Sequence, residues 1–328
     1  MFRGIAIGDN LSVNNILTGK CPKDLTFESE WGNSPITKKY IHSIKKFGFN
    51  TVKLPVTWTC HISYTDTQCI IQDWFVNRLR EIINWCIEEQ LYVIVNTQHD
   101  ENWIAHNNTA EETNKKVLML WSSILDSFDD ISQKHLIFED FNEVGYEEWE
   151  GGFERFHIIS RQIYNLIRKR NKERIFISEG MWADPKTISE TYHKEFYDKY
   201  LYLGFHLYAP HDFTINDKPA YHSNMKKHII WNLQYIFPML EELQIKHGSK
   251  LFCTEFGCNT KNRNKEEIFF WYKKVLEFMN SHKIPYVAWD DGHDRSLFDR
   301  KNNCLKIKIP ALKRHMLPNI STVKSKEV

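Results

Sequence analysis

The amino-acid sequence predicts an α/β fold, a single (β/α)8 TIM barrel, and two observations support this. Eight short apolar runs rich in Val, Ile, Leu and Phe recur between residues 2 and 291. Each run alternates only weakly between apolar and polar residues, as strands covered on both faces do. The segments between the runs are longer and amphipathic, so strands and helices are expected to alternate along the chain.

The expected strands are short, and most of them end in polar or aromatic residues. In chain order they are FRGIAIG (2–8), NTVKLPV (50–56), LYVIVN (91–96), HLIFEDF (135–141), RIFISEG (174–180), LYLGFHLY (201–208), KLFCTEFG (250–257) and PYVAWDD (285–291).

Four of the connecting segments are predicted individually as helices. In residues 73–90, apolar Phe75, Leu79 and Ile82 recur at helical spacing, and Asp73 is placed to cap the first turn. The other three helices are expected in residues 36–49, where the helix begins near Thr37, in residues 153–170 and in residues 265–282.

The alternative architecture is a doubly wound open sheet. Such a sheet usually carries a Gly-rich phosphate-binding turn after its first strand, and GIAIGDN (4–10) is not one. No Pro/Gly/Ser-rich linker interrupts the chain. We therefore expect one domain over residues 1–312 and a polar, basic tail over residues 313–328.

The composition excludes some classes of partner. The 328 residues carry a net charge of +1, which gives no electrostatic reason to expect nucleic acid or an anionic membrane surface. No apolar run approaches the 18 residues of a membrane span. Aromatic residues reach 14%, which suits a large core together with a stacking surface.

The cysteines and the N-terminus bear on the compartment. The seven cysteines match no zinc-binding spacing, so free thiols in a reducing compartment are expected. The first ten residues, MFRGIAIGDN, lack the apolar region of a signal peptide. The location stays open: we expect a cytoplasmic protein, or a secreted one if a signal has been removed.

Polar and aromatic side chains gather where the expected strands end, which is the face on which barrel active sites form. They are Lys53 on strand two, Gln98, His99 and Trp103 on strand three, Asn142 and Glu143 on strand four, Glu179 and Trp182 on strand five, His206 and Tyr208 on strand six, Glu255 on strand seven, and Trp289 and Asp290 on strand eight.

The segment FEDFNEV (138–144) holds three carboxylates, of which one is predicted to reach the barrel mouth. Glu139 lies four residues before Glu143, so it sits roughly 13 Å deeper along a strand and should have a partner within the barrel. Asp140 has the opposite parity. Strands four and seven lie three apart in an eight-membered ring, so Glu143 and Glu255 can face each other across the opening.

Two facing carboxylates flanked by Trp and His suggest glycoside hydrolysis. One carboxyl group protonates the leaving oxygen, and the other attacks the anomeric carbon or activates water. Apolar sugar faces stack on aromatic rings, which would give Trp289 a role. Glutamate pairs also occur as structural groups or metal ligands, and the residues alone leave these alternatives open.

Several longer stretches resemble the glycoside hydrolase family 5 cellulases, particularly the bacterial endo-β-1,4-glucanase and xyloglucanase branch. The similar stretches are EWGNSPITKKYIHSIKKFGFNTVKLPVTW (30–58), LYVIVNTQHDENW (91–103), LIFEDFNEV (136–144), FHLYAPHDFT (205–214), LFCTEFG (251–257) and VAWDDGHDRSLFDR (287–300). They run almost from end to end of the chain.

The resemblance implies a role for each matching residue. Glu143 would be the general acid/base and Glu255 the nucleophile of a retaining hydrolase with a covalent glycosyl-enzyme intermediate. Asn142 would hydrogen-bond the sugar 2-hydroxyl, and His206 and Tyr208 would orient the two carboxylates. Trp289 would be the sugar platform. The resemblance further implies a β-linked glycan substrate and no metal or organic cofactor, and we expect a monomer.

The chain departs from the family pattern at two positions near the expected sugar site. Lys53 replaces an Arg, which keeps the charge but loses the planar fork. Gln98 replaces the first residue of a His-His pair whose second is His99. A barrel that binds glycan with weak or no turnover is therefore the alternative function, and a transglycosylase that uses the same residues also stays open.

Overall fold

A closed barrel of eight parallel strands forms the centre of the molecule. The computed structural model describes residues 1–13, 21–100, 104, 108–145, 152–188, 198–216, 222–248, 250–261 and 263–306. The barrel strands are β1 (Arg3–Ala6), β2 (Thr51–Leu54), β5 (Tyr92–Val95), β6 (Leu136–Glu139), β7 (Phe176–Glu179), β8 (Leu201–Leu207), β9 (Leu251–Phe256) and β10 (Tyr286–Ala288). All eight expected strands and the (β/α)8 prediction are confirmed, and the open sheet is excluded.

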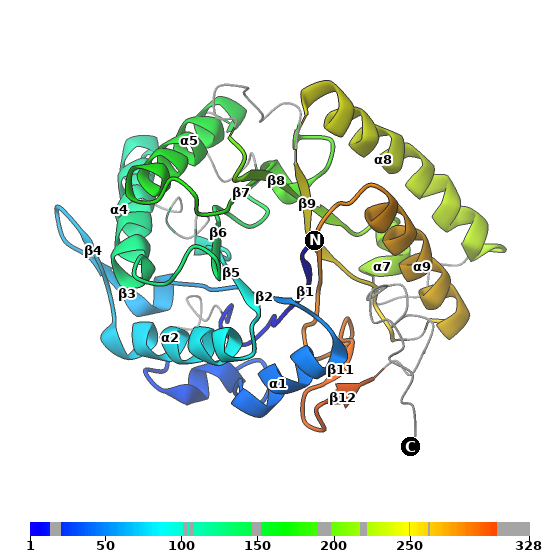
Figure 1. The fold of residues 1–328 in the computed structure, drawn as a ribbon, viewed down its shortest axis with the longest axis horizontal. Coiled ribbons are helices and arrows are strands. Elements are labelled where there is room, and N and C mark those ends of the chain that lie inside the picture. The colour runs from blue at the N-terminus through cyan, green and yellow to red at the C-terminus, as the bar shows by residue number, and fades with distance from the viewer. Residues whose placement is uncertain are drawn as a thin grey trace, which may run out of the picture.

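Helices surround the barrel, as Figure 1 shows. The longer ones are α1 (Lys38–Phe47), α2 (Asp73–Glu88), α4 (Ala110–Phe128), α5 (Gly152–Arg170), α8 (Met225–His247) and α9 (Lys265–Ser281), and the short elements are α7 (His211–Thr214), η2 (Leu25–Ser29), η3 (Thr59–His61) and η4 (Met181–Ala183). The four helices predicted individually are α1, α2, α5 and α9. Helices α4 and α8 were not predicted individually.

Two N-terminal helix caps were predicted from the sequence, and the structure confirms the cap of α1 but not the cap of α2. The Thr37 hydroxyl accepts a hydrogen bond from the backbone N–H of Tyr40 at 3.2 Å, so α1 begins where the sequence predicts. Asp73 was expected to cap α2, but it is the first helical residue and Gln72 is the N-cap, without a side-chain bond. Inside the first turn, the Asp73 carboxylate can still complement the helix dipole.

The floor of the barrel is an apolar layer to which six strands contribute one inward side chain each. The layer consists of Ala6, Ile94, Ile137, Ile177, Phe252 and Val287, all at most 1% exposed. Phe2 and Tyr202 pack against it. Since side chains alternate along a strand, the inward positions two residues further on point into the barrel mouth.

Two small antiparallel sheets that the sequence pattern did not predict lie outside the barrel. The strands β3 (Ile62–Tyr64) and β4 (Cys69–Ile71) form one, and β11 (Phe298–Asp299) and β12 (Cys304–Leu305) form the other. Their strands are only two or three residues long, too short for a periodic signal.

A disulfide bond contradicts the expectation that all seven cysteines are free. Cys21 and Cys60, 39 residues apart in the sequence, are bonded with their Cα atoms 5.4 Å apart. Cys69, Cys86, Cys253, Cys258 and Cys304 are free. The pairing depends on two loops meeting in space, which cysteine spacing alone does not reveal.

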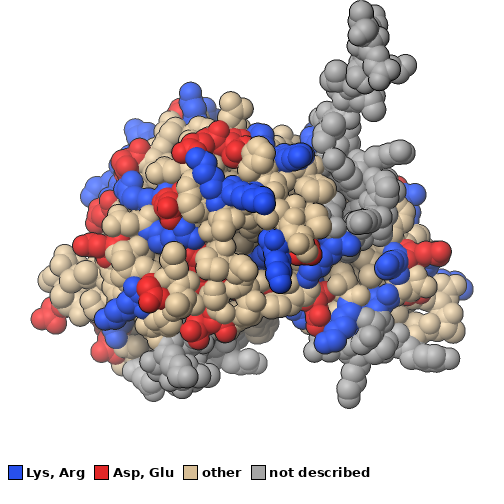
Figure 2. All heavy atoms as spheres, turned by 90° about the horizontal axis from the view of Figure 1, so that it is seen from below, with Lys and Arg blue, Asp and Glu red and all other residues tan. Residues whose placement is uncertain are grey.

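The surface agrees with the near-neutral composition. On the face drawn in Figure 2, Lys and Arg side chains are interspersed with Asp and Glu side chains. Among the described residues, no helix combines the length and the apolar character needed to cross a membrane. The predicted tail, residues 313–328, lies outside the described residues.

Candidate active site

A polar layer lies directly above the apolar floor of the barrel. Two residues beyond Ile137 and Ile177 come Glu139 and Glu179, and His206 follows Gly204 at the same spacing on β8. All three side chains are buried. The alternation of the strands therefore stacks charged groups on an apolar base that water does not reach.

Lys53 is the cation at the bottom of this layer. Its ammonium nitrogen lies 2.8 Å from Oε2 of Glu139 and 3.2 Å from Oε1 of Glu255, and the Lys53 side chain is fully buried. Glu139 is thus buried and paired within the barrel, as the strand geometry predicts. It is not isolated from the site, because Lys53 joins it to Glu255.

His206 joins three carboxylates. Its Nδ1 lies 2.6 Å from Oε1 of Glu143, and its Nε2 lies 2.9 Å from Oε1 of Glu179 and 3.7 Å from Oε1 of Glu255. One carboxylate oxygen each from Glu143 and Glu255 lies within 4.8 Å of the other and of a His206 ring nitrogen. The two glutamates do face each other across the barrel mouth.

Glu143 owes its exposure to a turn in the backbone. Strand β6 ends at Glu139, and Glu143 takes a left-handed conformation with φ of 56°. Its N–H donates to Oε2 of Glu179 at 3.2 Å, which holds the turn. The Glu143 side chain is 45% exposed, whereas those of Glu139 and Asp140 are buried. Asp140 accepts hydrogen bonds from Ser160 and Ser178.

The charge states follow from these contacts. Burial alone would raise the pKa of Glu179, but His206 and Lys53 outweigh it and lower that pKa to about 2. Burial and the neighbouring Glu179 raise the pKa of Glu139 well above its usual value despite Lys53. The two neighbouring carboxyl groups therefore have pKa values shifted in opposite directions, and Glu179 is ionised at neutral pH.

His206 and Glu143 share a proton. Burial opposes a charged imidazole, yet attraction to Glu255, Glu179 and Glu143 raises the pKa of His206 well above its usual value. Partial burial of the Glu143 carboxylate likewise opposes its ionised form, but the charge and hydrogen bond of His206 lower the pKa of Glu143. At neutral pH the free protein holds an imidazolium against the Glu143 carboxylate, and the pair titrates as a unit.

Glu255 is held from two sides. Lys53 contacts its Oε1, and the Tyr208 hydroxyl donates to its Oε2 at 3.1 Å. The glutamate is 4% exposed. These contacts fix the orientation of the carboxylate and leave only a narrow face of it open to the cleft.

A cleft of about 1030 Å³ lies above these groups. Eight of the nine residues predicted for the site line it: Gln98, His99, Asn142, Glu143, His206, Tyr208, Glu255 and Trp289. The ninth, Lys53, lies beneath it. Trp103, which the sequence also placed near strand three, lies outside the described residues.

Two of the predicted polar residues differ in their freedom to bind a ligand. The side-chain carbonyl of Gln98 already accepts a hydrogen bond from Asn96 at 3.0 Å. The side-chain oxygen of Asn142 is buried without a hydrogen-bond partner among the described residues. Asn142 is thus the better placed of the two to accept a hydrogen bond from a hydroxyl group of a ligand.

Sequence reasoning missed part of the cleft wall. Trp231 and Tyr235 on α8 line the cleft and are 56% and 60% exposed. Their rings contact each other edge to face with centroids 5.1 Å apart. The i, i+4 spacing of two large aromatic residues is the only sequence signal that could have indicated them. A second hollow of about 850 Å³, between β4, α4 and α5, lies away from the carboxylates.

Comparison with known proteins decides the family. The model of Cellulase (glycosyl hydrolase family 5) matches residues 16–294. The chain belongs to glycosyl hydrolase family 5. The resemblance inferred from its motifs is confirmed, and this glycosyl hydrolase family 5 protein is a cellulase-like glycoside hydrolase.

Individual relatives of this family 5 protein are moderately similar to it. Endoglucanase A of Ruminococcus albus is 27% identical over 301 residues, covering 84% of this chain and 81% of the relative. Endoglucanase A of Clostridium longisporum is 29% identical over 288 residues, but the match covers only 54% of that protein. A solved structure, the GH5-4 broad specificity endoglucanase from Clostridium acetobutylicum, superposes with a TM-score of 0.80 at 26% identity and covers 97% of both chains.

Proposed function

We propose that this protein cleaves β-1,4-linked glucan or a related β-glycan with retention of anomeric configuration, with Glu143 as acid/base and Glu255 as nucleophile. The observation that carries the proposal is the separation of the two glutamates, whose nearest oxygens lie within 4.8 Å with His206 beside them. Retaining enzymes place their carboxyl groups about 5 to 5.5 Å apart, whereas inverting enzymes need about 6.5 to 9.5 Å.

In the first step, an oxygen of Glu255 attacks the anomeric carbon while the bond to the leaving oxygen breaks. Lys53 and Tyr208 hold the Glu255 carboxylate for in-line attack. The leaving oxygen receives a proton from Glu143. The product of this step is a glycosyl ester on Glu255 and a free sugar hydroxyl group.

The proton for the leaving oxygen comes from the Glu143–His206 pair. In the free protein the imidazole holds it, with Nδ1 only 2.6 Å from Oε1 of Glu143. A bound neutral glycan displaces water from the exposed Glu143 carboxylate, which disfavours the negative charge of Glu143. The proton therefore moves from the imidazole of His206 onto the carboxylate oxygen of Glu143. In the second step Glu143 takes a proton from water while the water oxygen attacks the anomeric carbon, which breaks its bond to Glu255 and releases the sugar and the Glu255 carboxylate.

Aromatic side chains of the cleft suit an extended sugar chain. The cleft is lined by Trp289, Trp182, Trp231 and Tyr235, and exposed aromatic rings offer flat apolar faces to pyranose rings. The relatives named above are endoglucanases, which supports cleavage within a β-glucan chain.

The test is release of reducing ends from carboxymethylcellulose, mixed-linkage β-glucan, xyloglucan, glucomannan and xylan. We expect the wild-type protein to release sugar from at least one of them. Glu255→Ala should lower kcat at least about 10⁴-fold, and Glu143→Ala about 10²- to 10⁴-fold. Glu88→Ala, which removes an exposed carboxylate on α2, is the control.

The stereochemistry of the first product separates the mechanisms. Proton NMR of the fresh hydrolysate should show the β-anomer before mutarotation. An α-anomer would mean inversion and would remove the nucleophile role of Glu255. Binding to a glycan by wild type and Glu255→Ala without any release would instead establish the alternative, a binding barrel.

A further inference from the structure

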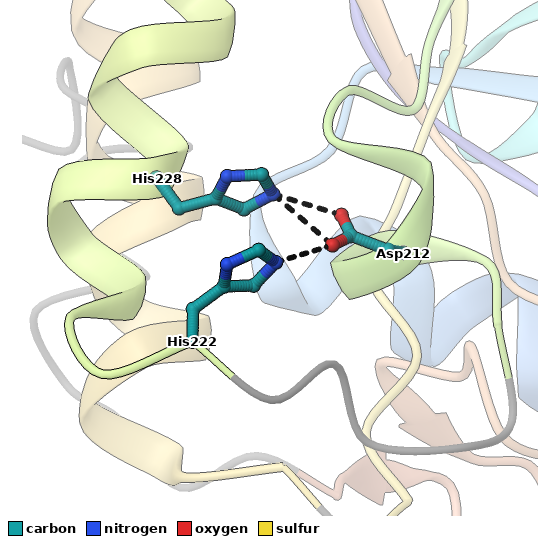
Figure 3. A group of neighbouring side chains, drawn as sticks. All are labelled: Asp212, His222 and His228. Carbon is teal, nitrogen blue, oxygen red and sulfur yellow. Dashed lines mark hydrogen bonds and ion pairs between the residues drawn. The ribbon is translucent and has the colours of Figure 1, made fainter.

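Three side chains outside the catalytic centre converge between α7 and α8, as Figure 3 shows. Asp212 lies on α7, His222 precedes α8, and His228 lies in the first turn of α8. The His222 Nε2 is 2.7 Å from Oδ2 of Asp212, and the His228 Nε2 is 3.0 Å from Oδ1 and 3.1 Å from Oδ2.

We propose that Asp212, His222 and His228 bind one divalent transition-metal ion, with zinc as the ion that the ligands suit best. Two imidazole nitrogens and one carboxylate form a ligand set of the kind that zinc takes with three protein ligands and one water. Calcium and magnesium prefer oxygen ligands, so two imidazoles argue against them.

The arrangement of the rings supports a shared ligand centre. The two imidazole rings stack with centroids 3.7 Å apart and an interplanar angle of 17°, so both Nε2 atoms point the same way. The three candidate ligand atoms lie within 4.8 Å of one another. In a tetrahedral zinc site, bonds of about 2.0 to 2.1 Å place ligand atoms roughly 3.3 Å apart. The nitrogen–oxygen contacts of 2.7 to 3.1 Å need to widen by roughly 0.2 to 0.6 Å, and the stacked rings must turn so that both Nε2 lone pairs meet at the ion.

The backbone that carries these ligands is held independently of any ion. Arg263 donates to the carbonyl oxygens of Asp212 at 3.1 Å, Phe213 at 3.0 Å and Asn216 at 2.6 Å, which anchors α7. The Asn224 side chain accepts from the N–H of Lys227 at 3.0 Å and caps α8. The Asp212 and His222 side chains are 35% and 36% exposed, so an ion and a water ligand can reach them.

A metal here would connect the two elements that flank the sugar cleft. His228, Trp231 and Tyr235 follow each other at helical spacing on α8, and the two aromatic residues line the cleft. On the other side, His211 on α7 lines the same cleft. An ion bound at Asp212, His222 and His228 would therefore fix the aromatic wall against the loop that follows Tyr208.

The experiment is calorimetric titration of the chelator-treated 328-residue chain with zinc chloride at neutral pH. We compare wild type with His222→Ala, His228→Ala and the control His42→Ala. His42 also contacts a carboxylate, Glu89 at 2.9 Å, but no second imidazole joins this pair within the described part of the chain. We expect the affinity for one zinc ion per chain to fall by more than about 100-fold in His222→Ala and in His228→Ala. The affinity should be unchanged in His42→Ala. His222 lies before α8 on the surface, so its variant stays informative if His228→Ala fails to fold.

Cobalt provides a second readout, since a tetrahedral Co²⁺ site absorbs visible light. Wild type should show these bands, and both imidazole variants should lose them. Wild-type protein without zinc binding would overturn the proposal, as would zinc affinity and cobalt bands that are equal in wild type, His222→Ala and His228→Ala. The latter result would assign the ion to other groups, such as Glu143, His206 and Glu255 in the catalytic centre.

Discussion

At the scale of single residues, the barrel mouth brings together more carboxyl groups than cationic groups, and most of them are buried. Four carboxyl groups, Glu139, Glu143, Glu179 and Glu255, share two cationic groups, Lys53 and His206. Burial and the neighbouring Glu179 favour the protonated form of Glu139, because they raise its pKa. A buried ion pair is costly to break, since the group left behind has neither water nor a partner.

Replacing Lys53 with Met tests this balance. Glu139 and Glu255 would lose their common cation in a fully buried place. We expect the free energy of unfolding at pH 7 to fall by about 3 to 5 kcal/mol, measured by urea denaturation. Lys38→Met removes a cation whose ion pair with Glu88 is more than half exposed and should cost at most about 1 kcal/mol. Equal losses in the two variants would contradict the role given to Lys53.

The Glu143–His206 pair predicts how activity depends on pH. Because the pKa of His206 is raised, the pair keeps its proton above the usual histidine value of 6.5, and kcat should fall on the alkaline side only beyond that pH. In His206→Gln the proton is carried by the carboxyl group of Glu143 alone. The alkaline limb of the kcat profile should therefore move to lower pH by at least about one unit. A kcat profile with the same alkaline limb in both proteins would remove His206 from the proton transfer.

At the scale of elements, the site depends on how closely neighbouring strand ends approach. The end of β1 brings Gly8 under the indole of Trp289, which follows β10. A Cβ atom on Gly8 would lie only 2.5 Å from Cζ2 of Trp289. The glycine is therefore required for the position of the ring, and its role is packing rather than backbone freedom.

Gly8→Ala should displace the indole that we propose as a sugar platform. We expect KM for a soluble β-glucan to rise about tenfold, equivalent to about 1.4 kcal/mol, with a smaller change in kcat. Gly257→Ala is the matched control, since its Cβ would meet Trp289 at 3.4 Å, an ordinary contact. Steady-state kinetics of the three proteins decide the matter, and an unchanged KM in Gly8→Ala would refute the platform role.

At the scale of the whole molecule, one covalent link joins segments that follow different barrel strands. Cys21 lies after β1, and Cys60 lies in η3 after β2. The bond closes a loop spanning 39 positions, which restricts the unfolded chain. Disulfides of this kind persist in oxidising compartments, whereas free thiols were expected from the sequence.

Removing this bond should destabilise the folded chain by about 4 kcal/mol on the loop-entropy estimate. We predict that loss for Cys60→Ser relative to wild type, measured by denaturant unfolding without reductant. Thiol titration of the denatured, unreduced wild-type protein should give the five free cysteines and not seven. Seven reactive thiols would show that the bond does not form.

Local patterns in the sequence predicted much of the fold and the site. Apolar runs and amphipathic segments indicated all eight barrel strands and four helices, because strand and helix periodicity is a short-range property. Strand parity separated Glu139, which points into the barrel, from Asp140, whereas Glu143 reaches the mouth through the turn after β6. The position of polar residues at strand ends then placed eight of the nine predicted residues on one cleft, since parallel strands bring their carboxyl ends to the same face.

The sequence by itself thus determined the barrel, the family and the pair of glutamates at its mouth. Only the tertiary structure decided which groups share a proton, which cysteines pair, that α8 supplies an aromatic wall, and that Asp212, His222 and His228 meet. The physical reason is that burial, pKa and ligand geometry depend on neighbours that are distant in the chain. No local periodicity records those neighbours.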